Sequence, residues 1–272
     1  MMNCKQKCIW RWAFVLALAC GLAGIPWAWA QIGISGLSMD VTIPPGGTFT
    51  GSLTVINRSP QPRQFTVELR DYDRDIHGGL VVLPAGTHPR SLAKFIVAIT
   101  PLTFTLRPEQ RQQINFNIKI PPQERGPHWG ALAISSPLPP SNPQQGPISI
   151  TAEEQFLFRV RQTDPTNAVN KGRLTGMQVL LPDQSKPLRV LIDYENIGTT
   201  FQELRGEVRI INARGDIVAK VAINPSPVLP GGKLRLEVPL EQKLPSGNYV
   251  AVAIIDFGGD SLLGAQARFK VP

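Results

Sequence analysis

Beyond residue 30 the sequence contains no cysteine, because Cys4, Cys8 and Cys20 are the only three. Disulfides, zinc–thiolate sites and cysteine nucleophiles are therefore excluded from the rest of the chain. That part also lacks a long uncharged apolar run, so we expect no stable membrane span in it. Only three histidines occur, and none stands in a frame such as Gly-x-Ser-x-Gly or His-Glu-x-x-His. We expect no enzyme, no metal and no cofactor.

The first thirty residues have the composition of a secretory signal peptide. Three basic residues precede the uncharged stretch WAFVLALACGLAGI, a proline ends it, and Ala28-Trp29-Ala30 places small residues at the two cleavage positions. We expect cleavage after Ala30 and export to the periplasm or the cell surface. Two alternatives stay open, namely retention of the segment as an anchor and lipidation of Cys20.

The chain after residue 30 carries a modest basic surplus. The formal charge falls from +8 to +5 without the first thirty residues, because three basic and no acidic residues are lost. A surplus of this size fits contact with an anionic envelope surface. No Lys/Arg run and no aromatic–basic module indicates nucleic-acid binding. The remaining length suffices for one large or two ordinary domains.

Short alternating runs dominate this part of the chain. Apolar and polar residues alternate in runs that Gly, Pro and Asn separate, and no stretch has a convincing helical period. The runs cover residues 48–57, 64–72, 112–120, 155–160, 188–196, 204–211, 233–240 and 248–257. This pattern predicts an all-β fold of the sandwich type, since a parallel sheet would need helices between its strands.

The sequence also repeats itself. WGALAI (129–134) matches YVAVAI (249–254) at an offset of 120, and a proline-bearing turn precedes each. Further upstream, LTVIN (53–57) and IDYEN (192–196) both end in an asparagine that leads into a polar loop. Matched features in the same order indicate one module used twice.

The repeat predicts the domain organisation. Residues 31–163 and 173–272 are expected to form two immunoglobulin-like β-sandwich domains in tandem. The polar segment 164–172 breaks the alternation and is the predicted hinge.

His128-Trp129 is the most conspicuous pair of residues in the first module. In immunoglobulin-like sandwiches an aromatic side chain near the start of the sixth strand anchors the preceding turn. Tyr249 holds that place in the second module, and the repeat puts Trp129 there in the first. We therefore predict a structural role for both, with the indole of Trp129 packed between the sheets and its nitrogen bonded to a backbone carbonyl. A glycan-binding platform at Trp129 is the alternative.

Two short motifs have ordinary structural interpretations. Asp71, Asp73 and Asp75 alternate like the first ligands of a calcium loop, but the glycine and the twelfth-position glutamate of such loops are missing. We expect a hydrated strand end there. The Arg-Gly-Asp tripeptide at 214–216 lies between two alternating strands, where a hairpin turn needs glycine.

The most informative region joins a proline-rich stretch to the last strand of the first module. Residues 135–147 contain five prolines and few apolar residues, which predicts a long loop. Residues 148–162 then alternate on both sides of Glu153-Glu154, where we expect a bulge. Such a strand either accepts a partner's strand at a sheet edge or is simply long and buried, and both interpretations stay open.

This arrangement resembles the periplasmic pilus-assembly chaperones of the PapD-like family. The likeness is greatest over residues 97–161, and it implies two immunoglobulin-like domains and no catalytic activity. In that family the last strand of the first domain donates apolar residues to an unfinished pilus subunit, and basic residues in the interdomain cleft hold the carboxylate at its C-terminus. The resemblance implies the following partner-binding residues here: Ile148, Ile150, Phe156 and Phe158 in the donor strand, with Arg159 or Arg161 in the cleft.

The sequence thus predicts a non-enzymatic exported protein that binds envelope or pilus subunits by strand donation. A weaker likeness concerns the two-module extracellular proteins of Gram-positive surfaces that bind peptidoglycan and a surface protein. A cell-wall or adhesion module is therefore the alternative.

Overall fold

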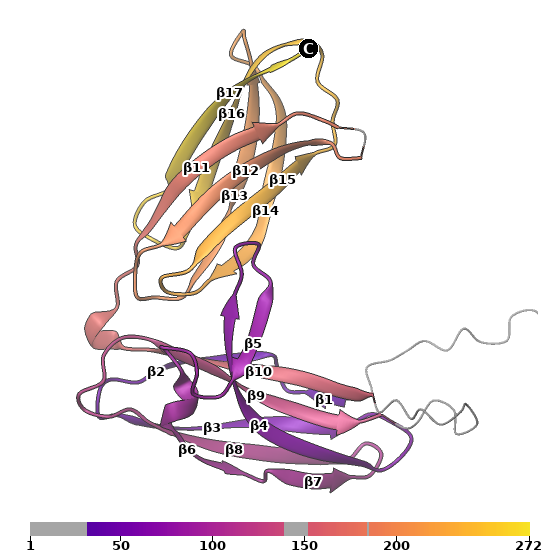
Figure 1. The fold of residues 1–272 in the computed structure, drawn as a ribbon, viewed down its shortest axis with the longest axis vertical. Helices are drawn as coiled ribbons and strands as arrows, with labels where there is room; N and C mark the ends of the chain where they lie inside the picture. Colours follow the sequence, from indigo (N-terminus) through magenta and orange to yellow (C-terminus); the bar gives the residue numbers. More distant parts are fainter. Residues whose placement is uncertain (1–31, 139–151, 184) are drawn as a thin grey trace, which may run out of the picture.

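The computed structural model describes residues 32–138, 152–183 and 185–272. Over these ranges the chain forms β-strands and two short 3-10 helices, η1 (Leu92–Phe95) and η2 (Pro165–Asn167). Figure 1 shows two β-sandwiches set at an angle to one another. The predicted all-β class with two tandem immunoglobulin-like sandwiches is confirmed. The predicted signal peptide, Ile148 and Ile150 lie outside the described residues.

The first sandwich has two sheets, whose strand orders are β1-β3-β8-β6 and β2-β10-β9-β4-β5, with β7 also paired to β4. The strands are β1 (Ile32–Ile34), β2 (Ser38–Thr42), β3 (Thr48–Asn57), β4 (Arg63–Arg74), β5 (Leu80–Pro84), β6 (Ile96–Thr100), β7 (Thr103–Leu106), β8 (Arg111–Lys119), β9 (His128–Pro137) and β10 (Glu153–Thr163). The start of the chain crosses between the sheets, because β1 pairs with β3 whereas β2 pairs in parallel with β10.

The second sandwich also has two sheets, ordered β11-β12-β15 and β14-β13-β16-β17. Its strands are β11 (Gly172–Leu180), β12 (Leu188–Asn196), β13 (Gln202–Asn212), β14 (Ile217–Val228), β15 (Lys233–Leu240), β16 (Gly247–Asp256) and β17 (Leu263–Val271). Among the described residues no strand pairing joins the two sandwiches. That each sandwich folds as a separate domain within the predicted boundaries stays a prediction.

Alternation along the strands builds each core. In β8 the side chains of Ile114, Phe116 and Ile118 are buried, while their sequence neighbours are exposed. They pack against the inward residues of the facing sheet, which include Phe158 and Val160 of β10. The second sandwich has its own buried cluster of the same kind. No helix in the described part of the chain is long and apolar enough to cross a membrane.

A buried asparagine at the end of a strand occurs in both sandwiches with the same hydrogen bonds. The Asn57 amide nitrogen donates to the carbonyl oxygen of Gln61 (2.8 Å), and its side-chain oxygen accepts from the backbone N–H of Ser59 (3.0 Å). Asn196 repeats both bonds, to the residues four and two positions further on (2.9 and 3.0 Å). Because neither polar group can reach water, each needs these partners. This identity of geometry supports the interpretation that one module is used twice.

The last strand of the first sandwich is regular where a bulge was expected. Glu153 and Glu154 pair with Pro137 and Ser136, and the register continues without a shift to Gln162 opposite His128. The prediction of a bulge is therefore wrong. Glu154 faces the inside of the sheet, in phase with Phe156 and Phe158. Its carboxylate forms an ion pair there with Arg63 of β4.

Candidate functional site

Strand β10 has one open edge over its first half. It pairs with β9 from Glu153 to Gln162, but β2 pairs only with Arg159–Thr163 on the other side. Among the described residues, none pairs with residues 153–158 on that side. The opening ends where β2 begins, at Ser38.

The backbone groups that face this opening can be identified from one hydrogen bond. The N–H of Arg159 donates to the carbonyl oxygen of Leu37, on the β2 side of β10 (3.1 Å). Successive residues of a strand point their backbone groups to alternate sides, so the N–H and C=O groups of Gln155 and Leu157 also face this side. An unpaired row of this kind is a template for a further strand.

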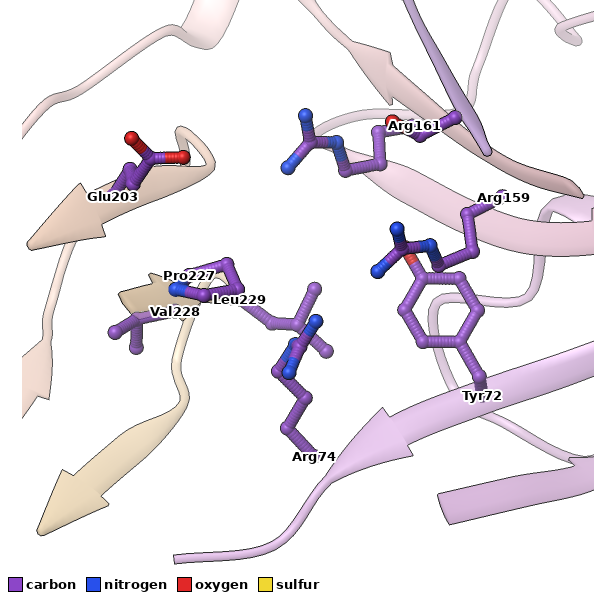
Figure 2. A pocket seen from close by; sticks show the side chains of 9 residues that line it. Tyr72, Arg74, Arg159, Arg161, Glu203, Pro227, Val228 and Leu229 are labelled. Atoms are coloured by element: carbon purple, nitrogen blue, oxygen red, sulfur yellow. The ribbon is translucent and has the colours of Figure 1, made fainter. Parts of the chain in front are cut away.

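A pocket of about 140 Å³ lies between the two sandwiches, next to the end of the open edge. Arg159 and Arg161 reach it from β10, Tyr72 and Arg74 reach it from β4, and residues 227–229 and Glu203 of the second sandwich form its opposite wall. Figure 2 shows the three guanidinium groups on the first-sandwich side of this space. They lie on one side because residues 72 and 74, like 159 and 161, occupy alternate positions on the outer face of the sheet.

The lining of this pocket has a net positive charge, with three arginines against Glu203. Arg161 binds Asp40 through two bonds (2.5 and 2.6 Å), and its guanidinium also lies over the ring of Phe201 at 5.5 Å. Arg74 and Arg159 donate to backbone carbonyl oxygens, and neither has a carboxylate within ion-pair distance among the residues that the structure describes. Arginine clusters of this kind bind carboxylates or phosphates in two-point fashion.

The neighbouring groups respond to this charge. Burial lowers the pKa of the Arg74 guanidinium below its ordinary value, and the charge of Arg159 lowers it further. Burial raises the pKa of the Tyr72 hydroxyl to about 12, although the three arginines oppose that rise. Tyr72 therefore remains a neutral hydroxyl at physiological pH. A bound anion would relieve the repulsion among the arginines.

Trp129 forms the joint between the sandwiches. Its side chain is 2% exposed, and its indole nitrogen donates to the carbonyl oxygen of Tyr72 at 2.9 Å. The ring packs edge-on against Phe201 of the second sandwich, with 5.7 Å between centroids, in a small cluster that also contains Leu229. The predicted bond to a backbone carbonyl is present, but the indole packs between the two domains. The expectation that it lies between the sheets of its own domain is wrong, and so is a glycan platform.

The prediction for Trp129 failed because the inward-facing positions of β9 are offset by one residue from those of β16 when the two repeats are aligned. In β9 the inward side chains are those of His128, Leu132 and Ile134, whereas Trp129 lies on the opposite face with the alanines. In β16 Tyr249 faces inward, and its hydroxyl donates to the carbonyl oxygen of Pro245 (2.8 Å). By the face that it presents, His128 corresponds to Tyr249.

A second contact joins the sandwiches at the tip of the β4–β5 hairpin. The N–H of Arg235, on edge strand β15, donates to the carbonyl oxygen of Ile76 in the hairpin turn at 2.6 Å. In Figure 1 this hairpin projects from the first sandwich toward the second. The two sandwiches thus contact each other on both sides of the arginine pocket, through the Trp129 cluster and through this bond.

The structure brings together only some of the predicted partner-binding residues. Arg159 and Arg161 reach the pocket, and Phe156 lies half-buried along the open half of β10. Phe158 is 2% exposed and packs edge-on against Phe116, so the expectation that its side chain faces a partner is corrected: it is a core residue. The binding roles of Ile148, Ile150, Phe156, Arg159 and Arg161 stay a prediction.

Sequence reasoning missed Tyr72 and Arg74 from β4, and Phe201 and Glu203 from the second sandwich. The alternation of residues 64–74 placed Tyr72 and Arg74 on one face, which was the available signal. No sequence feature indicated that the second sandwich would cover that face.

The two short motifs have structural roles. Asp71 and Asp73 lie in β4 and Asp75 in the turn that follows it, and the expectation of a hydrated strand end is wrong for Asp71. Asp71 is buried and accepts from the Ser91 hydroxyl (2.6 Å) and the His88 N–H (2.9 Å), while Asp75 accepts from two N–H groups of its own turn. In the described part of the chain no group of His, Cys, Asp and Glu side chains is arranged to hold a metal. Gly215 has a φ of 89° in the turn that follows β13, which confirms the turn interpretation of residues 214–216.

Comparison with known proteins gives structural similarities only. No protein-family model matches the chain, and no curated protein matches its sequence. The Escherichia coli chaperone DraB has a TM-score of 0.41 and 14% identity, over 89% of this chain and 97% of that chain. The YadV chaperone gives 0.45 and 14%, over 88% and 100%. The complex of CsuC with the tip adhesion subunit CsuE, from Acinetobacter baumannii, gives 0.45 and 10%, over 87% and 98%.

Proposed function

We propose that this protein is an exported, non-enzymatic chaperone that binds an unfinished envelope or pilus subunit by adding one of its strands to the open edge of β10. The observation that carries the proposal is the position of the arginine pocket at the end of that edge. A strand laid along residues 153–158 reaches the pocket at Arg159, so strand and charge form one continuous site. The predicted signal peptide supports action in the periplasm or at the cell surface.

The charges along β10 favour one orientation of the added strand. Glu153 and Glu154 lie at the start of the open edge, and Arg159 and Arg161 lie at its end. A strand parallel to β10 brings its C-terminal carboxylate to the arginines and keeps it away from the two glutamates. The antiparallel orientation would bring an amino group or an internal peptide to the arginines, which would leave their positive charges without a negative partner.

Affinity then has two sources. Backbone hydrogen bonds to residues such as Gln155 and Leu157 require no particular partner sequence. The carboxylate contact adds charge-assisted bonds in a small pocket. At about 140 Å³ the pocket is large enough for one carboxylate group and several waters, because a single water needs about 10–15 Å³ of such space.

The test compares peptides that differ only at the C-terminus. A set of synthetic peptides of about ten residues with alternating apolar residues is made with a free carboxylate and as the amide. For the peptides that bind, calorimetry should show affinity at least about tenfold weaker for the amide. Arg159→Ala should remove most of this difference, whereas Arg214→Ala, in the exposed turn after β13, should leave it unchanged.

Equal affinity of acid and amide in the unsubstituted chain would refute the carboxylate site. Failure of every peptide in the set to bind would refute strand addition at this edge.

A further inference from the structure

The register of β10 is not set by a turn. The strand begins at Glu153, whereas its neighbour β9 ends at Pro137, so residues 138–152 separate the two. In a tight hairpin the type of turn fixes which residues face each other. Here the connection is too long to do so, and the register must be fixed by side chains.

The apolar pattern of β10 fixes only half of the register. Phe156, Phe158 and Val160 face the core, and Arg159 and Arg161 face the interdomain pocket. A slip by one residue would reverse every side chain, which the buried face forbids. A slip by two residues keeps each apolar side chain on the inner face. The apolar pattern therefore leaves the open half of β10 free to shift by two residues relative to β9.

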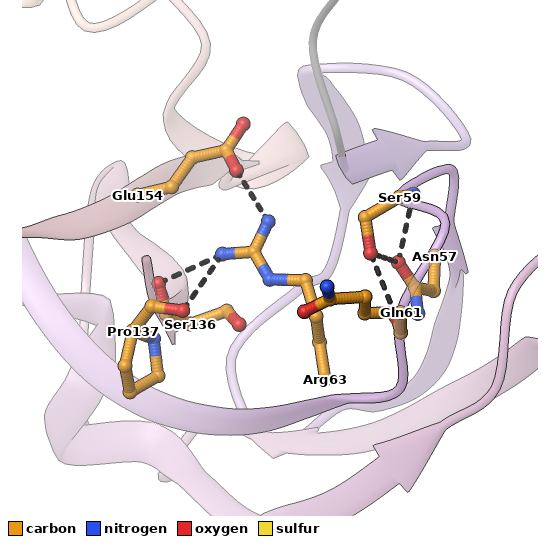
Figure 3. A network of polar contacts seen from close by, with 7 residues as sticks. All are labelled: Asn57, Ser59, Gln61, Arg63, Ser136, Pro137 and Glu154. Carbon is orange, nitrogen blue, oxygen red and sulfur yellow. Dashed lines mark hydrogen bonds and ion pairs between the residues drawn. The ribbon is translucent and has the colours of Figure 1, made fainter. Parts of the chain in front are cut away.

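The contacts of Arg63 distinguish the observed register from one that is slipped by two residues. It lies at the start of β4 with only 3% of its side chain exposed, and its guanidinium binds the carboxylate of Glu154 at 2.8 Å. The same group donates to the carbonyl oxygens of Ser136 (3.0 Å) and Pro137 (3.2 Å). Figure 3 shows this side chain between the end of β9 and the start of β10. Arg63 of β4 thus contacts both β9, where that strand ends, and β10, where that strand begins.

The energetics of such a pair favour specificity over stability. Removing two charges from water costs about as much as their attraction returns, so a buried ion pair is a weak source of stability. A misplaced partner is costly, however, because the remaining charge is buried without compensation. A two-residue slip would replace Glu154 by Phe156 or Ala152 beside Arg63. Only the observed register places a carboxylate beside the guanidinium.

The other end of β10 has a different anchor. Gln162 is fully buried, donates to the carbonyl oxygen of Ile43 (2.7 Å) and lies 3.1 Å from the ring nitrogen of His128. This anchor and the pairing with β2 hold the closed half of the strand. Neither contacts residues 153–158, so a local shift of the open half, taken up by an irregularity near Arg159, is opposed at the other end of the strand by Arg63 and Glu154.

We propose that Arg63 and Glu154 form the register lock of the open half of β10. Both are positioning residues: they hold the edge 153–158 in line with Arg159 before any partner arrives. For the use of this register the inference rests on the proposed function, but the register itself can be measured without a partner.

Engineered disulfides report the register directly. In a chain whose three native cysteines are replaced by serine, Ser135→Cys with Gln155→Cys tests the observed pairing. Ser135→Cys with Leu157→Cys tests the register slipped by two residues. The yield of each cross-link under mild oxidation is compared between chains with and without Arg63→Met/Glu154→Met. Thermal unfolding of the same chains is recorded without the added cysteines.

The expected result separates register from stability. Without the ion pair, the slipped cross-link should rise at least about tenfold relative to the observed one, a factor that corresponds to about 1.4 kcal/mol. The thermal midpoint should change little, because the apolar contacts of two methionines in place of the ion pair offset the loss of the donor to Ser136 and Pro137. Arg173→Met, which breaks the exposed cross-strand pair with Glu195, is the control and should leave the cross-link ratio unchanged.

Two outcomes would overturn the proposal. The first is a slipped cross-link that stays at its original level in the double variant. The second is a midpoint that falls in proportion to any change in register, since that identifies the pair as an ordinary structural support. If the cross-links behave as expected while no peptide binds, the register lock stands and the proposed function fails.

Discussion

Replacing Trp129 by alanine should destabilise the first sandwich and loosen the joint between the two domains. The indole is almost fully buried, and truncation of a buried tryptophan costs about 3–5 kcal/mol. Its bond to the carbonyl oxygen of Tyr72 is lost at the same time, which leaves that oxygen without this donor. We expect a loss of about 4 kcal/mol in the free energy of unfolding, near the middle of that range.

Phe201→Ala is the matched substitution on the other side of the joint. Phe201 is only half-buried, and an edge-to-face aromatic pair contributes about 0.5–1.5 kcal/mol beyond its area. We expect a loss of roughly 2 kcal/mol from this change alone, about half of it from the buried area of the ring. In the double variant the two losses should not add, since the contact between the rings can be removed only once.

Urea unfolding of the unsubstituted chain, the two single variants and the double variant gives this coupling energy. Fluorescence reports where the indole of Trp129 lies. In a chain whose four tryptophans in residues 1–30 are replaced by phenylalanine, emission reports Trp129 alone. Phe201→Ala should shift that emission to longer wavelength, because water gains access to the indole. A coupling energy below about 0.3 kcal/mol together with unchanged emission would refute the placement of Trp129 between the domains.

Two further predictions concern neighbouring residues. Burial lowers the pKa of His128, so the folded chain binds fewer protons than the unfolded chain, and stability should fall as the pH drops below about 6.5. Urea unfolding at pH 7 and pH 5 should show this loss, and His128→Gln should reduce it; an equal loss in both chains would contradict the assignment. Phe158→Ala should cost about 3–5 kcal/mol and Leu157→Ala clearly less, because the first faces the core and the second the joint. Thermal unfolding decides this, and equal losses would show that the assigned phase of β10 is wrong.

Much of the fold follows from alternation along the sequence. Three predicted runs, 48–57, 188–196 and 233–240, coincide with β3, β12 and β15. Strands at sheet edges were missed, because their pattern is weaker. β14 contains two prolines, which an edge strand tolerates, and β5 is a continuous apolar run rather than an alternating one.

The candidate site could be predicted only in part. Arg159 and Arg161 follow from the alternation of one strand and the resemblance to the chaperone family. Arg74 belongs to another strand and matters only because the second sandwich closes over the same face. The relative orientation of two domains depends on contacts such as Trp129 with Phe201, which no local pattern encodes.

The direction of Trp129 could not have been found from the local sequence alone. In both WGALAI and YVAVAI the aromatic residue is in phase with the alanines, yet Trp129 lies on the outer face of β9, whereas Tyr249 faces the core of the second sandwich. The same pattern therefore takes opposite faces in the two modules, and the contacts of Trp129 with Phe201 and Leu229 distinguish them.

Hydrogen exchange at the open edge of β10 tests the central claim most directly. The amides of Gln155 and Leu157 face the opening and have no strand beside them among the described residues. Addition of a binding peptide with a free carboxylate should slow exchange at both, while the amide of Phe156, which faces β9, should change little. If the peptide binds and these two amides keep their exchange rates while another edge such as β5 becomes protected, strand addition at β10 is contradicted.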